Sequence, residues 1–361
     1  MVRHLYVHIP FCPKVCPYCS FYKETSDRNK TQGFLDAVLA EAEIESPGLQ
    51  PHTVFFGGGT PTALSTSQLE YLIQGLKQRV DWSQVREFTI EMNPATVSCE
   101  KATALLQTGV NRVSMGVQSW DEALLKTLGR VHNAAQASRS YRILREAGVP
   151  NVNLDLIFGI PGQSAQQWRD SLRQTIDLGP DHISAYCLTY EEDTEFFRKF
   201  QIGEMAPEES RDSDFFEMAM DELSAAGYEQ YEISNYAIPG RVCEHNLAYW
   251  RGNEYAGLGP SAFSTRHACR RRTVADTADY IRRMTEGVDR FDFTETLDEA
   301  TRRAEWIAFA LRTSEGLPEN SLPPERISPL LQENLITQKE GRLRLTRSGK
   351  LVADEIAAEL I

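Results

Sequence analysis

The sequence has no excess of basic residues and no long apolar run. Its 361 residues include 38 Lys and Arg against 51 Asp and Glu, which gives a net charge of −13. A general nucleic-acid binder needs a clustered basic surface for its phosphate contacts, so we expect no nucleic acid among the partners. No apolar stretch approaches the length of a membrane span, which leaves peripheral contact as the one form of membrane association to expect.

A secretory signal and an even set of cysteines are also missing. The chain has seven cysteines, and its N-terminus shows no signal-peptide pattern. A disulfide framework is therefore not expected, and the composition predicts a reducing, cytoplasmic location. The 41% hydrophobic content suits one large or two ordinary domains, each with a substantial core.

Three of the cysteines lie close together near the start of the chain. Cys12, Cys16 and Cys19 follow a strand-like stretch at 5–9, and the prolines between them exclude a helix. A loop that folds back would let the three sulfurs converge on one object. A zinc site needs a fourth ligand, and no second Cys or His pair of similar spacing follows. An iron-sulfur cluster with one iron left open is the better hypothesis, and a structural zinc is the alternative.

Helical and strand-like patterns alternate through the first half of the chain. We expect helices at 31–45, 67–79, 99–107, 121–127, 134–147 and 165–178, and strands at 53–56, 87–91, 112–117, 152–157 and 182–187. Each connection between two successive strands is long enough for a helical crossover, which predicts parallel βαβ units. Roughly six such units predict an α/β fold that forms an open, partial (β/α)6 version of the TIM barrel.

Polar or glycine-rich residues stand at the ends of these strands. The segment Gly57-Gly-Gly-Thr-Pro61, Glu91, Gln118 and Asp155 are examples. The carboxyl ends of parallel strands build one site in such folds, so these residues should face the same cavity as the cysteine loop. The three glycines either let a ligand approach the backbone or form a tight turn, and the sequence leaves both interpretations open.

These motifs resemble those of the radical S-adenosylmethionine (SAM) superfamily. The C-x3-C-x2-C spacing, with Tyr18 before the last cysteine, is similar to the loop that holds a 4Fe-4S cluster in that family. There SAM chelates the unique iron, and its reduction gives a 5′-deoxyadenosyl radical. Further motifs, at 6–12, 57–62, 111–119, 128–132 and 153–163, resemble the branch that contains oxygen-independent coproporphyrinogen III oxidase and the HemW haem chaperones.

The resemblance implies a set of cofactor contacts and no certain catalytic residue. Cys12, Cys16 and Cys19 would hold the cluster. The SAM contacts implied are Tyr6 beside the unique iron, Tyr18 and Thr189 at the adenine, Gly58, Gly59 and Thr60 at the methionine end, Glu91 at the ribose, and Gln118, Arg130 and Asp155. The residues around Thr189 match the family poorly, so that position is the weakest of the set.

Two departures resemble the chaperones rather than the oxidases. The oxidases have a fourth cysteine where this chain has Phe21, and they have an N-terminal extension where only residues 1–4 precede the first strand. In addition, the segment His245-Asn-Leu-Ala-Tyr-Trp250 is similar to an H-N-x-x-Y-W signature that the chaperone branch associates with haem. A neutral imidazole is a common axial ligand of haem iron, and aromatic rings offer a flat apolar surface.

The resemblance thus implies a haem chaperone that binds haem at His245 and passes it to an unknown acceptor protein. Cys243 is a competing soft ligand, although a buried thiol is the simpler interpretation. The alternative function is that of a radical SAM enzyme, either a coproporphyrinogen III oxidase that performs oxidative decarboxylation or a related methyltransferase. Whether the chain is an enzyme is therefore left open by its sequence.

We predict three segments. Residues 1–235 would form the partial barrel with the cluster and SAM site, 236–293 a connecting segment with the haem motif, and 294–361 a winged-helix-like domain. The last prediction rests on helices at 299–311, 327–334 and 348–360 and a hairpin turning at 340–341. In this acidic chain we favour a lid or partner-docking role for that domain over DNA binding.

Three smaller features complete the interpretation. The basic stretch 266–272 is expected to be a solvated surface turn, with contact to ligand carboxylates as the alternative. Residues 255–264, rich in small side chains, are expected to form a loop against the cavity. Cys99, Cys187 and Cys269 are expected to be buried small residues rather than ligands.

Overall fold

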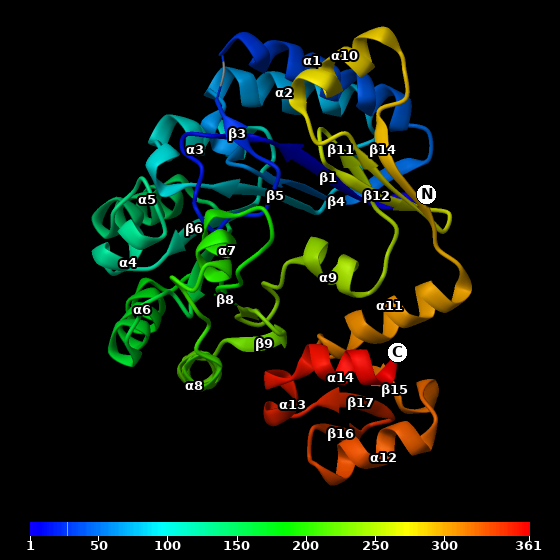
Figure 1. Ribbon diagram of the computed structural model, residues 1–361. Coiled ribbons are helices and arrows are strands. Elements are labelled where there is room, and N and C mark those ends of the chain that lie inside the picture. The colour runs from blue at the N-terminus through cyan, green and yellow to red at the C-terminus, as the bar shows by residue number, and fades with distance from the viewer. Residues whose placement is uncertain (27) are drawn as a thin grey trace.

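The computed structural model describes residues 1–26 and 28–361, and a nine-stranded sheet forms its centre (Figure 1). The strand order is β11-β1-β4-β5-β6-β7-β8-β10-β9. Six consecutive strands of this order are parallel: β1 (Val2–Ile9), β4 (Leu49–Gly58), β5 (Glu87–Met92), β6 (Arg112–Gln118), β7 (Asn151–Phe158) and β8 (His182–Cys187). The predicted (β/α)6 arrangement is confirmed.

Helices that follow these strands cover the outer face of the sheet. They are α1 (Arg28–Glu45), α2 (Thr66–Arg79), α3 (Cys99–Gln107), α4 (Glu122–Thr127), α5 (Ala134–Ala147), α6 (Ala165–Leu178) and α8 (Glu209–Ala225). Outward-facing strand residues such as Val7, Val54 and Val113 are buried under these helices in one apolar core. Local hydrogen bonds fix the N-terminal ends of α2, α5 and α6, because each of these helices begins with a complete capping box.

The inner face of the curved sheet is polar. Because side chains alternate along a strand, every second residue points inward. The inward residues include Tyr6 and His8 on β1, Thr53 on β4, Glu87, Thr89 and Glu91 on β5, Arg112 and Ser114 on β6, Asn153 and Asp155 on β7, and His182, Ser184 and Tyr186 on β8. A polar interior adds little to stability, so its presence points to a ligand site.

Residues 229–296 complete the barrel on both edges. Strands β9 (Glu229–Glu232) and β10 (Asn235–Ala237) extend the sheet antiparallel to β8, and β11 (Ala256–Leu258) pairs parallel to β1. The expectation of a loop at 255–264 is therefore wrong. A three-residue strand of small side chains has no alternation to reveal it, and its pairing with β1 depends on the backbone.

The same part of the chain contributes five further elements. Strands β12 (Phe263–Arg266), β13 (Cys269–Thr273) and β14 (Phe291–Thr296) form a separate antiparallel sheet. Helix α10 (Thr277–Glu286) lies beside α1 in both ribbon views. Helix α9 (Glu244–Trp250) lies between the main sheet and the C-terminal unit (Figure 1).

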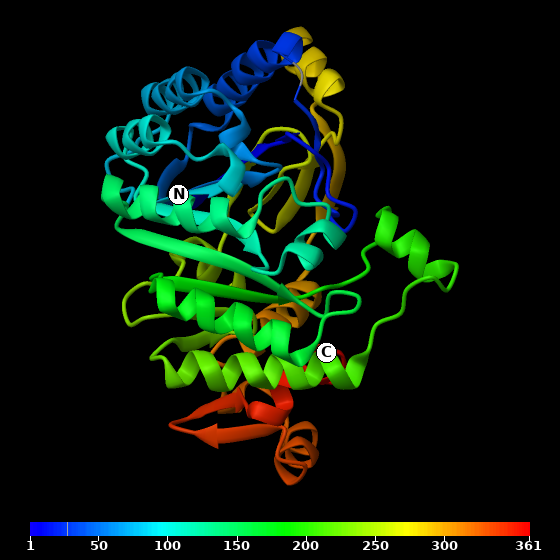
Figure 2. The ribbon, with the colours of Figure 1, turned by 90° about the vertical axis from the view of Figure 1, so that its left-hand side faces the viewer.

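The C-terminal unit has its own apolar core and stands at the foot of the molecule (Figure 2). It consists of α11 (Glu299–Leu311), β15 (Leu317–Pro318), α12 (Pro324–Gln332), β16 (Ile336–Lys339), β17 (Arg342–Leu345), α13 (Arg347–Leu351) and α14 (Ala353–Leu360). The hairpin turns at Glu340 and Gly341 as predicted. The last helix is broken at Val352, where the φ angle is −126°. Across the described residues, no helix has the length and apolar character to cross a membrane.

Candidate functional site

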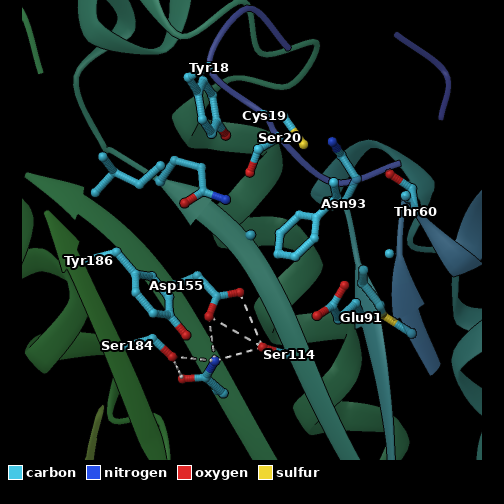
Figure 3. A pocket seen from close by; sticks show the side chains of 18 of the residues that line it. Tyr18, Cys19, Ser20, Thr60, Glu91, Asn93, Ser114, Asp155, Ser184 and Tyr186 are labelled. Atoms are coloured by element: carbon cyan, nitrogen blue, oxygen red, sulfur yellow. Dashed lines mark hydrogen bonds between the residues drawn. The ribbon is translucent and has the colours of Figure 1, made fainter. Parts of the chain in front are cut away.

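A cavity of about 590 Å3 lies on the inner face of the sheet (Figure 3). It is lined by all the residues that the sequence assigns to SAM or haem: Tyr6, Tyr18, Gly58, Gly59, Thr60, Glu91, Gln118, Arg130, Asp155, Thr189 and His245. They come from strands and loops far apart in the chain, and the parallel sheet brings them to one place. The predicted convergence of these residues is thus present in the structure.

The three clustered cysteines are free thiols at one end of this cavity. Cys12 ends β2 (Phe11–Cys12), which pairs with β3 (Glu24–Thr25), and the N–H of Cys19 donates to the carbonyl of Cys16 at 3.3 Å. Cys19 lines the cavity, whereas Cys12 is buried with its Sγ 3.6 Å from Thr60 Oγ1. In the described part of the chain, no three His, Cys, Asp or Glu side chains are grouped closely enough for a single metal ion. Three thiols on one short loop are the donor set of a cluster that leaves one iron open.

Two cationic side chains stand by these thiols. Arg130 Nη1 lies 3.6 Å from Cys16 Sγ, while Nη2 donates to the carbonyl of Gly116 at 2.8 Å. Lys23 donates to the carbonyl of Cys19. Burial raises the pKa of the Cys12 and Cys19 thiols, and the charges of Arg130 and Lys23 act in the opposite direction. The cations therefore favour the thiolate form that binds iron.

Close packing against β1 explains two of the three glycines after β4. A Cβ on Gly58, where φ is +104°, would lie 2.5 Å from the His8 ring, and a Cβ on Gly59 would lie 2.7 Å from the Pro10 carbonyl. The N–H groups of Gly59 and Thr60 donate to the carbonyls of Ile9 and Phe11. The glycine segment is thus attached to the strand that enters the cysteine loop, and its backbone also lines the cavity.

The phenol of Tyr6 is oriented by His8. His8 Nε2 lies 2.8 Å from the Tyr22 carbonyl and must donate to it, so Nδ1 accepts from the Tyr6 hydroxyl at 3.1 Å. Burial lowers the pKa of His8 to about 4, which keeps its ring neutral. The Tyr6 phenol is therefore held in the wall of the cavity.

Glu91 and Asp155 line the same cavity as carboxylate acceptors (Figure 3). Burial raises the pKa of Glu91 to about 8, and the negative charge of Asp155 adds to this effect. Asp155 accepts hydrogen bonds from Ser114 Oγ at 3.1 Å and from Asn153 Nδ2 at 2.7 Å. Asp155 can accept hydrogen bonds from hydroxyl or amino groups of a ligand. Glu91 is mostly protonated near pH 7 and can donate one hydrogen bond as well as accept.

Gln118 has a strained backbone. Its φ is +68°, and a β-bulge separates it from Gly116 on the edge facing β7. Its side-chain Oε1 is buried, with no hydrogen-bond partner among the described residues. Left-handed backbone at a non-glycine residue is uncommon and often marks a functional position.

His245 is fixed by contacts on two sides. Glu87 on β5 accepts the backbone N–H groups of Glu244 at 2.7 Å and of His245 at 3.0 Å, so its carboxylate holds the start of α9. His245 Nδ1 lies 2.7 Å from Thr53 Oγ1, which is also 2.9 Å from His4 Nδ1. Burial lowers the pKa of His245 to about 3, so the ring is neutral near pH 7. Its Nε2 is buried, and no described residue bonds to it.

Cys243 is not positioned as a second ligand in the cavity. Its thiol is fully buried and donates to Glu87 Oε1 at 3.5 Å, and burial raises its pKa to about 12. The interpretation of Cys243 as a buried thiol is the one that its surroundings support.

Sequence reasoning missed several residues that line the inner part of the cavity. They are Phe55, Arg112, Ser114, Asn153, Ser184, Tyr186 and Asn246. A signal for some of them was present, because Arg112-Val-Ser-Met-Gly alternates polar or small with apolar residues. A parallel strand covered on both faces is normally apolar throughout, so this alternation indicates a polar inner face.

The arginines of the basic stretch 266–272 form contacts within the chain. Arg266 pairs with Glu45, Arg270 with Glu305 and Arg272 with Asp292, while Arg271 lies over the Phe291 ring. The hairpin turns at His267 and Ala268, and these arginines fasten it to neighbouring elements. Their pairing within the chain supports the interpretation of a surface turn over contact with a ligand.

The expectation that the scattered cysteines are buried is wrong for two of the three. Cys99, at the start of α3, and Cys187, at the end of β8, are exposed, and Cys269 is half-buried. Cys187 lines the cavity because β8 ends at its rim. A single cysteine in a sequence carries no signal of its depth, since its surroundings are set by the fold.

The raised pKa of Glu91 predicts a stability effect that depends on pH. The folded chain binds the Glu91 proton more tightly than the unfolded chain, so this contribution to stability is complete below about pH 4.5 and is lost as the pH rises to about 8. Glu91→Gln cannot ionise. We expect it to raise the Tm of the ligand-free chain by about 2–4 °C at pH 8 and to change it little at pH 5.

Differential scanning calorimetry at both pH values measures this difference. Glu359→Gln, at an exposed position on α14, is the control and should show no such pH dependence. Equal Tm shifts at the two pH values for Glu91→Gln would contradict the assigned ionisation.

Comparisons with known proteins agree with this geometry. Residues 6–175 match the family model described as "Radical SAM superfamily". Two similar proteins named "Heme chaperone HemW" come from Bacillus subtilis (33% identical over 98% of both chains) and Escherichia coli (34% identical over 98% of this chain and 96% of the relative).

A solved structure shows the fold. It is coproporphyrinogen III oxidase (HemN) from Escherichia coli, described as a radical SAM enzyme, with a TM-score of 0.86 and 22% identity over 99% of this chain and 90% of that one. The fold is thus α/β, a partial (β/α)6 TIM-like barrel of the radical SAM type with a small C-terminal winged-helix-like α+β unit. Together with the relatives over nearly the full length, these findings show that the chain belongs to the HemW family within the radical SAM superfamily.

Proposed function

We propose that this chain is a haem chaperone, which binds haem in the cavity and passes it to an acceptor protein. The observation that carries the proposal is His245. Its imidazole is neutral, and its Nε2 is buried in the cavity wall with no protein partner among the described residues. An unpartnered imidazole nitrogen beside aromatic rings is suited to a metal-containing planar ligand. The names of the relatives support the same function.

The proposal includes a 4Fe-4S cluster held by Cys12, Cys16 and Cys19, with exchangeable SAM. When bound, the cluster and SAM would supply one-electron chemistry or a sensor of the redox state. Gly58, Gly59 and Thr60 would hold the methionine end of SAM, and Glu91 its ribose. Tyr6, Tyr18, Gln118, Arg130, Asp155 and Thr189 complete the proposed contacts, all of which line the cavity. Free thiols and a cluster need reducing conditions, which supports a cytoplasmic location.

Thr53 orients the ring of His245. Its hydroxyl stands between His4 Nδ1 and His245 Nδ1. Iron binding at His245 Nε2 requires a lone pair there, so His245 Nδ1–H would donate to the Thr53 oxygen. Thr53 is thus a positioning residue that can support the iron-binding tautomer of His245.

Haem binding at His245 also requires movement. The side chain is 2% exposed, and the rings of Phe55 and Tyr249 lie with their centroids 5.2 and 5.1 Å from its ring. A porphyrin needs a slot at Nε2, so these rings or α9 must move apart when haem enters. Such an opening would suit a protein that releases its cargo again.

The alternative is a radical enzyme that decarboxylates coproporphyrinogen III or transfers a methyl group, in the same cavity. The observation that favours it is the set of proposed SAM residues, which converge beside open cavity space. Phe21 disfavours the oxidase, because it occupies the place of that family's fourth cysteine and its side chain is 65% exposed at the rim.

One anaerobic experiment separates the two functions. The cluster is reconstituted, and haem is titrated in one sample while dithionite, SAM and coproporphyrinogen III are added to another. We expect stoichiometric haem binding and no protoporphyrinogen. Multiple turnovers to protoporphyrinogen with matching 5′-deoxyadenosine would establish an oxidase instead.

A further inference from the structure

We propose that the inner end of the cavity is a carboxylate-binding subsite built on Arg112, and that it takes a propionate group of a porphyrin. The identity of that carboxylate rests on the proposed function, whereas the existence of the anion subsite rests on the structure alone. None of the SAM and haem contacts implied by the family resemblance includes Arg112.

The first observation is a buried guanidinium without a partner. Arg112 is 2% exposed and lines the cavity, and no hydrogen bond or ion pair joins its side chain to another described residue. Its Nε is among the fully buried atoms that lack a partner. A buried arginine is almost always paired, because an isolated buried charge is costly.

The carboxylates of the surrounding strands are already engaged. Glu87 accepts from the two backbone N–H groups at the start of α9 and from the Cys243 thiol. Asp155 accepts from Ser114 and Asn153. Neither forms an ion pair with Arg112. Burial lowers the pKa of Arg112 and the nearby charges of Glu87 and Asp155 help to raise it, but the guanidinium N–H groups remain available to an anion from outside.

The second observation is that other unpartnered polar atoms lie on neighbouring elements. Thr89 on β5 is in register with Arg112 on β6, and its buried Oγ1 has no described partner. His245 Nε2 on α9 lines the same cavity, also without a partner. Arg112 Nε and Thr89 Oγ1, both without a described partner on two neighbouring strands, indicate an absent polar occupant.

A carboxylate suits this set of donors. A guanidinium can donate to both oxygens of a carboxylate in one plane, and a hydroxyl can donate to a remaining lone pair. The cavity wall beside them includes Phe55 and Tyr249, which offer apolar surface to the rest of the ligand. An anion on an aromatic body fits this combination better than an inorganic ion does.

The carboxylate of SAM is not the proposed occupant. Arg130 donates to the carbonyl of Gly116 at the cluster end of the cavity. Arg112 lies four residues earlier on the same strand, about 13 Å away along β6. The two arginines therefore stand at opposite ends of the cavity, one beside the cysteine loop and one beside α9.

The test uses metal-free protoporphyrin IX and its dimethyl ester, which has no ionised carboxylate. We expect the wild-type chain to bind the free acid more tightly than the ester, by about tenfold or more. Arg112→Gln should lose this preference and bind both equally, while Arg112→Lys should retain part of it. Fluorescence quenching of the porphyrin measures the affinities, and iron content and SAM binding confirm that the cluster end of each variant is intact.

Thermal unfolding of the ligand-free chain adds a readout that a structural arginine would not give. The Arg112 side chain has no hydrogen bond or ion pair to a described residue, and Arg112→Gln removes only longer-range charge interactions, so it should change the Tm little. A large fall in Tm would show that Arg112 is needed for the fold, and would overturn the subsite.

The outcomes separate this subsite from the proposed function. Equal binding of acid and ester by the wild-type chain, or an undiminished preference in Arg112→Gln, overturns the subsite even where haem binds through His245. If the wild-type chain binds no porphyrin, the subsite is also overturned, and ordered water would be the hydrogen-bond partner of the Arg112 side chain. A carboxylate preference that needs Arg112, found in a chain that does not bind haem iron, supports the subsite and removes the chaperone proposal.

Discussion

Replacing Cys16 with alanine should leave the chain without its cluster. Two thiolates cannot hold a 4Fe-4S cube, so we expect iron to fall from about four atoms per chain to nearly none. The brown absorbance should disappear with it. Cys16 is half-buried and its Sγ contacts Arg130, so the substitution removes little packing and the fold should survive. Iron analysis after anaerobic reconstitution, with circular dichroism as the test of folding, measures the effect.

Cys99 provides the matched control. It is a free, exposed cysteine at the start of α3, and it does not line the cavity. Cys99→Ala should keep full iron content and absorbance. Full iron in Cys16→Ala would show that the cluster has been assigned to the wrong residues.

The second large effect is expected at the opposite end of the cavity. His245→Ala should weaken haem binding by about tenfold or more and change the haem spectrum, because the axial nitrogen is lost. The cluster should be unaffected, since the hydrogen bonds of His245 go to Thr53 and Glu87 rather than to the cysteine loop. Added imidazole should restore part of the spectrum by entering the space that the side chain leaves.

His52 is the control for this variant. It precedes Thr53 on β4, so its side chain points to the opposite face of the sheet, and His52→Ala should leave haem binding unchanged. If His245→Ala also kept the wild-type haem spectrum, the axial ligand would have to be another residue.

Local sequence signals were sufficient for the helices and strands of the first half of the chain. Helices α3, α5 and α6 have the predicted bounds, because a polar cap residue, an amphipathic pattern and, for α5 and α6, a closing glycine coincide. The parallel strands were predicted because each is a short run of strand-forming residues between two helical patterns. Helix α8 was missed although Phe216, Ala219, Met220 and Leu223 have helical spacing.

The second half was harder to predict for a physical reason. Strand β11 has three residues, and it exists because its backbone pairs with β1, more than 240 positions away. Helix α9 has seven residues, and its start is held by Glu87 on another strand. Interactions of this kind leave no period in the local sequence.

The residues of the candidate site also differ in how far the sequence predicts them. Family motifs named the residues at the cluster end, and all of the implied SAM residues line one cavity. The inner residues Arg112, Ser114 and Asn153 lie within the motifs at 111–119 and 153–163, but the resemblance implied no role for them. The structure places them in the wall of the cavity, on the inward face of the sheet. We assign them to the site because they are buried in its wall. Arg112 Nε has no hydrogen-bond partner among the described residues, whereas Asn153 donates to Ser114.

The most direct measurement of the central claim is haem transfer. The chain, reconstituted with its cluster and loaded with one haem, is mixed with a haem-free acceptor such as apomyoglobin, and the acceptor's haem spectrum is followed anaerobically with and without SAM. A chaperone should deliver its haem to the acceptor in nearly full yield, without forming a decarboxylated porphyrin. Haem that stays on the chain, or a chain that takes up no haem, would contradict the account.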